Sequence, residues 1–245
     1  MKKNLLTLLL LISTMLYSCK KDTPEYLINQ PNLALNFDGE HQFMIKQDGD
    51  NIDATGFSWT SSDPTVGVIS AAGLFSGRKI GKTTIKASGN GTTLTSEVTI
   101  NPYSNLCREP YTVFGSSKAT VKSKETRVVS EEIATGIQYQ PENSNFRGVV
   151  YLFEADKLTS TILFLGSTQA LLKESATFLA ERYTYEGITE DDVLVFSNNA
   201  VLVGLGYHAD LGYHAFFIPN TTNARSSIGS MMKNRIESIQ KLKAR

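Results

Sequence analysis

Residues 57–100 read FSWTSSDPTVGVISAAGLFSGRKIGKTTIKASGNGTTLTSEVTI, and this stretch decides the fold of the N-terminal half. Short β-rich runs alternate in it with groups of Gly, Asn, Asp and Pro. The clearest runs are residues 57–60, 83–87 and 94–100, and a further one at 43–45 precedes them. Strands of this length, with turn signals about every ten residues, predict an all-β sandwich.

The residue types at two positions of this stretch favour chain reversals. Residues 61–64 (SSDP) combine side-chain acceptors with the fixed φ of proline, which favours a chain reversal directly after the Trp59 strand. Residues 88–91 (SGNG) lie between two alternating runs, and an Asn-Gly step is a strong hairpin signal. Both features support several short antiparallel strands.

Four motifs follow one another in this order: the Trp59 strand, the Asp63-Pro64 turn, the corner 73–77 (GLFSG) and the closing strand 81–85 (GKTTI). Together they resemble the group 2 bacterial immunoglobulin-like family (Big2). The resemblance implies an immunoglobulin-like sandwich over residues 32–102, with Trp59 between its two sheets and no catalytic group. Gly67 departs from the family pattern, which usually has a small alanine-like residue there.

The first residues predict export. Met1-Lys2-Lys3 is a short basic start, residues 4–15 are almost all apolar, and residues 16–19 (LYSC) end the segment. This layout is typical of a secretory signal and too short for a spanning helix. An ordinary cleaved signal or an uncleaved anchor would share most of these features.

The ending of this segment resembles the lipobox of bacterial lipoproteins. That resemblance implies a signal peptide over residues 1–18, acylation of Cys19, and a tether over residues 19–31. The lysine-rich start of the mature chain, Lys20-Lys21-Asp22, resembles lipoproteins of the Bacteroidetes. We therefore expect an outer-membrane lipoprotein of the cell envelope, with its surface or periplasmic orientation left open.

Composition narrows the classes of partner. The chain has 24 Lys and Arg against 24 Asp and Glu, and loss of Lys2 and Lys3 with the signal leaves a charge of about −2. No nucleic-acid partner is implied by that balance. Once Cys19 is acylated, Cys107 is the only remaining cysteine, so no intramolecular disulfide is expected. We interpret Cys107 as a small buried apolar residue.

Residues 106–245 predict an α+β domain with an antiparallel sheet covered on one face by two helices. A hairpin is expected from strands 146–153 and 158–165, and further strands at 193–196, 200–208 and 213–218. Apolar spacing predicts a helix at 168–183, capped by Ser167, and a second at 226–242. A short helix is also expected within residues 114–122.

Candidate chemical groups are few. His208, Asp210 and His214 flank a predicted turn and form a weak candidate zinc site, although cross-strand packing of the two Tyr-His steps explains them equally well. Acidic runs at 131–132 and 190–192 could serve glycoside chemistry, and solvated surface explains them better. Residues 77–83 (GRKIGKT) resemble a phosphate-binding loop but are one residue short and precede a strand, which indicates a turn.

We expect a non-enzymatic envelope lipoprotein that needs no cofactor or metal and is held to the membrane through Cys19. A Big2 sandwich would act as a spacer that presents the C-terminal domain to a protein or glycan ligand, an expectation by analogy. Candidate contact residues are Tyr139, Tyr207 and Tyr213, which could equally belong to the core. The alternatives are an envelope enzyme with its site in the C-terminal domain and a structural assembly subunit.

Overall fold

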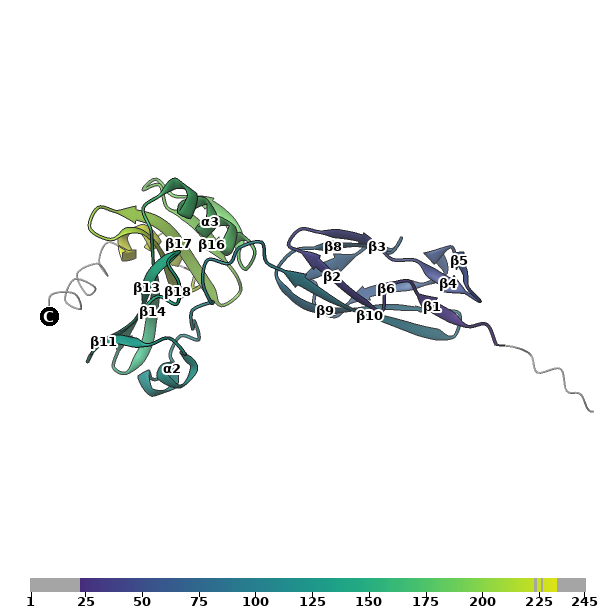
Figure 1. Ribbon diagram of the computed structural model, residues 1–245, viewed down its shortest axis with the longest axis horizontal. Coiled ribbons are helices and arrows are strands. Elements are labelled where there is room, and N and C mark those ends of the chain that lie inside the picture. The colour runs from purple at the N-terminus through teal and green to yellow at the C-terminus, as the bar shows by residue number, and fades with distance from the viewer. Residues whose placement is uncertain (1–22, 223, 226, 233–245) are drawn as a thin grey trace, which may run out of the picture.

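The computed structural model describes residues 23–222, 224–225 and 227–232. An elongated β-sandwich and an α+β domain lie end to end, joined by a short segment after Asn101 (Figure 1). Cys19 and the predicted signal peptide lie outside the described residues. Within the described residues, no helix is long and apolar enough to cross a membrane.

The N-terminal domain contains three small sheets. The largest has the spatial order β2 (Asn32–Asn36), β10 (Thr92–Asn101), β9 (Gly81–Gly89), β6 (Ser58–Ser61), with β2 parallel to β10. The second is β3 (Glu40–Gln42), β8 (Leu74–Gly77), β7 (Gly67–Ile69). The third is β1 (Tyr26–Ile28), β4 (Ile45–Gln47), β5 (Asp50–Ile52). A 3₁₀ turn, η2 (Ala54–Gly56), precedes β6. Strand β1 falls within the stretch expected to be a tether.

Aromatic and branched side chains fill the space between these sheets. Phe43, Phe75 and Ile85 are fully buried in one cluster, and each such side chain contributes about 1.5–3 kcal/mol. Trp59 is only half-buried, but it packs against this cluster and against a second one around Ile45. The tryptophan therefore links the two clusters rather than forming the centre of either.

Gly67 has a steric explanation. A Cβ atom at this position would lie 2.3 Å from Cζ of the buried Phe75 ring, which stacks directly on the β7 backbone. Even alanine would overlap the ring. The departure from the family pattern is thus matched by a large aromatic residue on the neighbouring strand.

The C-terminal domain is built on one eight-stranded antiparallel sheet. In spatial order its strands are β11 (Val129–Ile133), β12 (Gly136–Tyr139), β13 (Phe146–Glu154), β14 (Lys157–Leu165), β18 (Gly212–Pro219), β17 (Val201–His208), β16 (Leu194–Ser197) and β15 (Thr184–Ile188). The predicted hairpin is present as β13 and β14, and Ala155 and Asp156 make its turn with positive φ.

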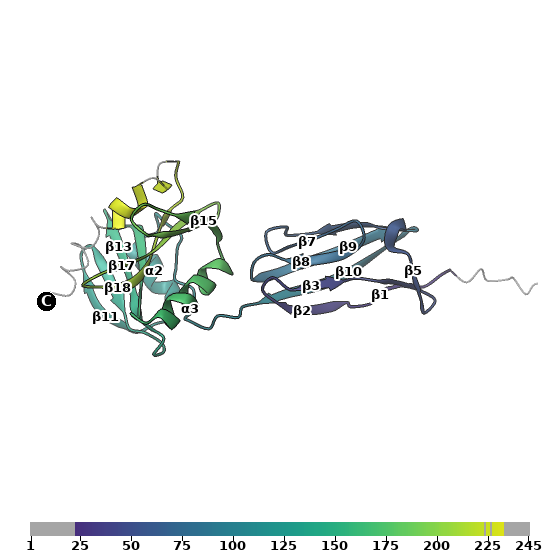
Figure 2. The same ribbon diagram turned by 90° about the horizontal axis from the view of Figure 1, so that it is seen from above.

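Helices cover both faces of this sheet, which corrects the expectation of one covered face and two helices. On one face, α2 (Lys118–Lys124) and α3 (Gln169–Ala180) place Val121 and Phe178 against strands β13, β14 and β17. On the other, Ile228 and Met232, from the helical residues 224–225 and 227–232, pack against Ile162 and Phe216. Figure 2 shows these residues across the sheet from α3.

Two helix boundaries differ from the expectation. Thr168, not Ser167, caps α3, because its side chain accepts a hydrogen bond from the Leu171 amide. The C-terminal helix expected over residues 226–242 already includes Ala224, and its part beyond Met232 lies outside the described residues.

Candidate functional sites at the domain junction and the distal hairpin

A buried carboxylate fixes the segment that joins the two domains. Glu181 directly follows α3 and is fully buried. Its Oε1 accepts hydrogen bonds from the amides of Tyr103 at 2.6 Å and Ser104 at 3.2 Å. The Ser104 hydroxyl donates to Glu174, also on α3, at 2.7 Å. A carboxylate that accepts several N–H donors holds them strongly, so the joining segment is fastened to α3.

A lysine of the sandwich completes the junction from the other side. Lys79 lies in the loop between β8 and β9, and its Nζ donates to the carbonyls of Ala180 and Tyr183, both at 2.8 Å. The Ile80 amide donates to the Glu181 carbonyl at 3.0 Å. The last carbonyls of a helix have no partner within the helix, and a cation there complements the helix dipole. Burial lowers the pKa of Lys79.

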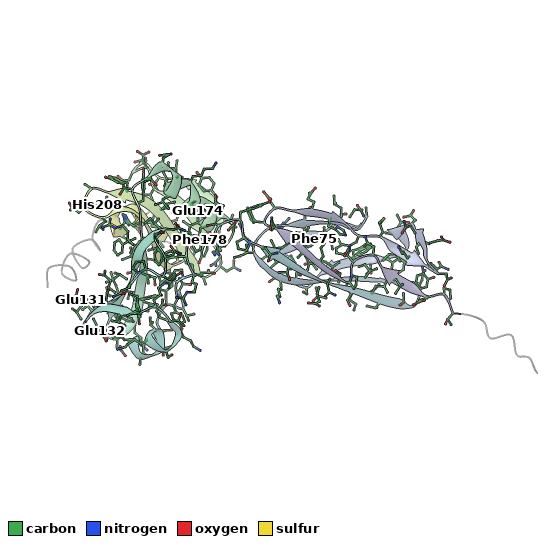
Figure 3. All side chains as sticks on the ribbon, viewed as in Figure 1. Phe75, Glu131, Glu132, Glu174, Phe178 and His208 are labelled. Carbon is green, nitrogen blue, oxygen red and sulfur yellow. The ribbon has the colours of Figure 1, made fainter. Side chains whose placement is uncertain are left out.

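We call this set of contacts, made by Lys79, Ile80, Tyr103, Ser104 and Glu181, the interdomain clasp. It spans positions about 100 residues apart, and in Figure 3 Glu174 and Phe178 lie on the side of the C-terminal domain that faces the sandwich. The loop that resembled a phosphate-binding motif is therefore a turn between strands that caps a helix of the other domain.

A groove of about 780 Å³ lies beside the clasp and is lined by both domains. The sandwich contributes residues 63–66 and 78–80. The C-terminal domain contributes Arg182, Thr184 and the turn 197–200. Pockets at domain interfaces are frequent binding sites.

A second candidate surface lies at the opposite end of the C-terminal domain. Figure 3 places His208 far from the sandwich, in the hairpin formed by β17 and β18, which we call the distal hairpin. Beside it, Tyr207 and Tyr213 are cross-strand partners whose rings meet edge to face, with centroids 5.1 Å apart. Tyr207 is 62% exposed. Tyr139 is buried and packs against Tyr151, so only two of the three candidate tyrosines are available to a ligand.

The histidines do not meet as a zinc site would require. His208 pairs with Gly212 and His214 with Gly206, so the two rings are not directly opposite. His208 Nδ1 accepts a hydrogen bond from the Asp210 amide, and burial lowers the pKa of His214, whose Nδ1 lies 3.1 Å from the Gly212 carbonyl. Among the described residues, no group of three or more His, Cys, Asp or Glu is arranged to hold a metal.

The two acidic runs and Cys107 do not form a catalytic site. Glu131 and Glu132 lie on β11, while residues 190–192 follow β15, so the two acidic runs occupy opposite edges of the eight-stranded sheet. At about 4.8 Å per strand they are too far apart to act as the paired carboxylates of a glycosidase. Burial raises the pKa of the Cys107 thiol to about 12, which makes it a poor nucleophile.

Sequence reasoning missed a buried ionic cluster. The Arg127 side chain is almost fully buried and pairs with Glu125 at 2.8 Å and with Glu142. The Tyr151 hydroxyl donates to Glu125 at 2.5 Å. Burial opposes ionisation of Glu125, but these hydrogen bonds and the guanidinium outweigh it and lower its pKa. Arg127 also donates to the Arg108 carbonyl, so the cluster fastens the segment after the junction to the sheet.

Comparison with known proteins identifies the first domain. Residues 28–100 match the family described as bacterial Ig-like domain (group 2), which confirms the resemblance of the sequence motifs. A comparison with curated proteins gave no significant match.

Solved structures with some similarity include two fragments of the S-layer protein SbsC and an intimin mutant. Domains 5–6 of SbsC match with a TM-score of 0.27 and 12% identity, over 81% of this chain and 86% of that chain. Domains 4–9 give a TM-score of 0.28 and 12% identity, over 82% and 28%. Intimin of EHEC O157:H7 gives 0.24 and 16%, over 55% and 89%. TM-scores this low support no conclusion about the present chain.

Proposed function

We propose that this protein is a non-enzymatic lipoprotein of the cell envelope, anchored through Cys19, in which the Big2 domain is a rigid spacer. The spacer presents the C-terminal domain to a protein or glycan ligand. The observation that carries the proposal is the interdomain clasp. A flexible joint would need no buried carboxylate, yet Glu181 holds the joining segment and Lys79 holds the end of α3.

The direction of the chain suits a spacer. Strand β1 begins at the end of the sandwich away from the C-terminal domain, and β10 leads into the joining segment at the other end (Figure 1). A lipid on Cys19 would therefore lie on one side of the sandwich and the ligand-binding domain on the other. The full length of the sandwich would separate the two.

The distal hairpin is the surface that such a spacer would expose best. Tyr207 and Tyr213 form an aromatic surface next to His208 and Asp210. Tyrosine rings combine a large apolar area with a polar hydroxyl, which is why they are enriched at binding interfaces. We assign the first contact with the ligand to this hairpin.

Three experiments test the proposal. Protease shaving of intact cells tests whether the protein faces outward. Membrane fractionation of cells that carry Cys19→Ala, beside the wild type, tests how the protein is attached. Lipid anchoring predicts that the variant leaves the membrane fraction, and retention of the variant there would contradict anchoring through this residue.

The third experiment captures envelope proteins and glycans on the immobilised mature chain. We expect Tyr207→Ser to reduce capture at least tenfold. Tyr103→Ser changes a similarly exposed tyrosine, whose contribution to the clasp is its main-chain amide alone, and this matched control should leave capture unchanged. Equal capture by both variants would remove the hairpin from the proposal.

A further inference from the structure

Strand β15 is an open edge of the eight-stranded sheet. It is the last strand in the spatial order and pairs only with β16. Tyr185 and Ile188 on this strand are 54% and 59% exposed. Proteins usually protect edge strands with charges, prolines or covering segments, because unpaired amides and carbonyls there can pair with another chain. An exposed edge with apolar side chains is therefore suited to accept an additional strand.

The interdomain groove begins where β15 begins, since Thr184 lines it. Three cations line the groove: Arg78, Lys79 and Arg182. The single carboxylate of the lining is Asp63, whose Oδ1 already accepts hydrogen bonds from the amide and hydroxyl of Thr65. Arg182 is paired with Glu181 at 3.4 Å and with Glu109 at 3.7 Å, so among the described residues the groove cations without a carboxylate partner are Arg78 and Lys79.

Several hydrogen-bond donors of these cations are unused within the described residues. The exposed Arg78 side chain makes no hydrogen bond or ion pair there, and Lys79 uses two of its three N–H groups. Arg182 donates from Nη1 to the Phe178 carbonyl at 2.8 Å and to Glu181 at 3.4 Å, and its buried Nε faces Glu109 at 3.7 Å, so its partners already lie within the protein. A carboxylate ligand would supply acceptors to the exposed Arg78 guanidinium and to the third N–H group of Lys79.

The direction of β15 connects these two features. Every pairing in the sheet is antiparallel. A strand added antiparallel to β15 would run from Ile188 toward Thr184 and would end in the groove. Its C-terminal carboxylate would then lie near Arg78 and Lys79.

We propose that β15 and the interdomain groove form a docking site for the C-terminal segment of a partner protein. The segment adds to the sheet as an antiparallel ninth strand, and its terminal carboxylate binds Arg78 and Lys79 in the groove. Main-chain hydrogen bonds would provide affinity, and the exposed Tyr185 and Ile188 would contact alternate side chains of the peptide. This site is separate from the distal hairpin and goes beyond the function proposed above.

The groove favours a peptide over a glycan. Its flank is a sheet edge, whose unpaired amides and carbonyls can pair with another main chain on either side of the bulge between Tyr185 and Gly187, and a sugar has no such repeat. A second copy of this chain pairing β15 with β15 would use the same edge but would leave Arg78 and Lys79 without a carboxylate.

The test screens the full mature chain against a random library of seven-residue peptides with free C-terminal carboxylates. Enriched peptides are then synthesised with a carboxylate or an amide at the C-terminus and measured by fluorescence anisotropy. We expect the amide to bind at least tenfold more weakly, because it loses the charge-assisted hydrogen bonds. Amide resonances of residues 184–188 should shift on binding.

Two variants separate the parts of the site. Arg78→Ala should weaken the carboxylate peptide at least fivefold and leave the amide peptide unchanged, while Ile188→Lys should weaken both. Lys86→Ala removes an equal charge from an exposed position on β9 and should have no effect. The proposal is overturned if no peptide is enriched, if carboxylate and amide bind equally, or if the shifts lie elsewhere. Concentration-dependent self-association abolished by Ile188→Lys, without peptide binding, would also overturn it.

Discussion

Replacing Lys79 by methionine should uncouple the two domains. The substitution keeps most of the apolar stem but removes two hydrogen bonds of 2.8 Å from a charged donor to the carbonyls of Ala180 and Tyr183. A hydrogen bond to a charged group contributes about 1.5–3 kcal/mol. Two such bonds would give about 3–6 kcal/mol. Because Lys79 is only half-buried and water can reach part of the site, we expect a loss below that range, about 2 kcal/mol in all.

Two assays would detect this loss. The single tryptophan, Trp59, lies in the sandwich, so its fluorescence during urea denaturation reports the stability of that domain in the context of the whole chain. ¹⁵N relaxation reports whether the domains tumble together. In the wild type we expect one correlation time for both domains, and in Lys79→Met two shorter ones.

Lys86→Met is the matched control, because it removes a lysine from an exposed position of the same sandwich. Surface substitutions of this kind change stability by about 0.5 kcal/mol or less. If Lys79→Met denatures and tumbles like this control, the clasp does not couple the domains and our reasoning about the junction is wrong.

Three further predictions concern the cores of the two domains. Gly67→Ala should lower the free energy of unfolding by about 1–3 kcal/mol in a urea titration, because the added methyl group overlaps the Phe75 ring. In the control Gly56→Ala the methyl group meets no atom within 4 Å, so the effect should be much smaller. The Cys107 thiol, with its pKa raised to about 12, should react with a disulfide reagent at pH 8 only after unfolding, and rapid reaction of the native chain would contradict its burial. The pKa of Glu125 in the folded chain is lowered from its ordinary value of 4.5, so ionised Glu125 stabilises the fold at pH values above 4.5. This stabilisation should be lost as the pH falls through the folded pKa. A Glu125→Gln variant should therefore show a flatter dependence of stability on pH below 4.5.

The sandwich could be predicted from sequence because its turns are local. The Asp63-Pro64 step and the Asn90-Gly91 step each determine a reversal through their own backbone preferences, and the strands between them follow. In the C-terminal domain, the β13–β14 hairpin was predicted for the same reason. Strand β15 was missed because its residues TYEGI are mostly exposed and carry little apolar periodicity.

The candidate sites were less predictable. The two tyrosines of the distal hairpin could be identified from their positions beside a turn, but nothing in the sequence distinguished them from the buried Tyr139. The clasp depends on residues such as Lys79 and Glu181 that come together only when two domains dock. A lysine in a turn and a glutamate after a helix are both ordinary surface residues until that contact forms.

The most direct test of the rigid spacer is a distance measurement between its two ends. Spin labels at Asn51→Cys, on β5, and Ala209→Cys, in the β17–β18 turn, occupy exposed positions in different domains. The partly buried Cys107, with its pKa raised to about 12, should not compete for label. We predict one narrow distance distribution by pulsed electron paramagnetic resonance, broadened by Lys79→Met. A broad distribution in the wild type would contradict the rigid spacer.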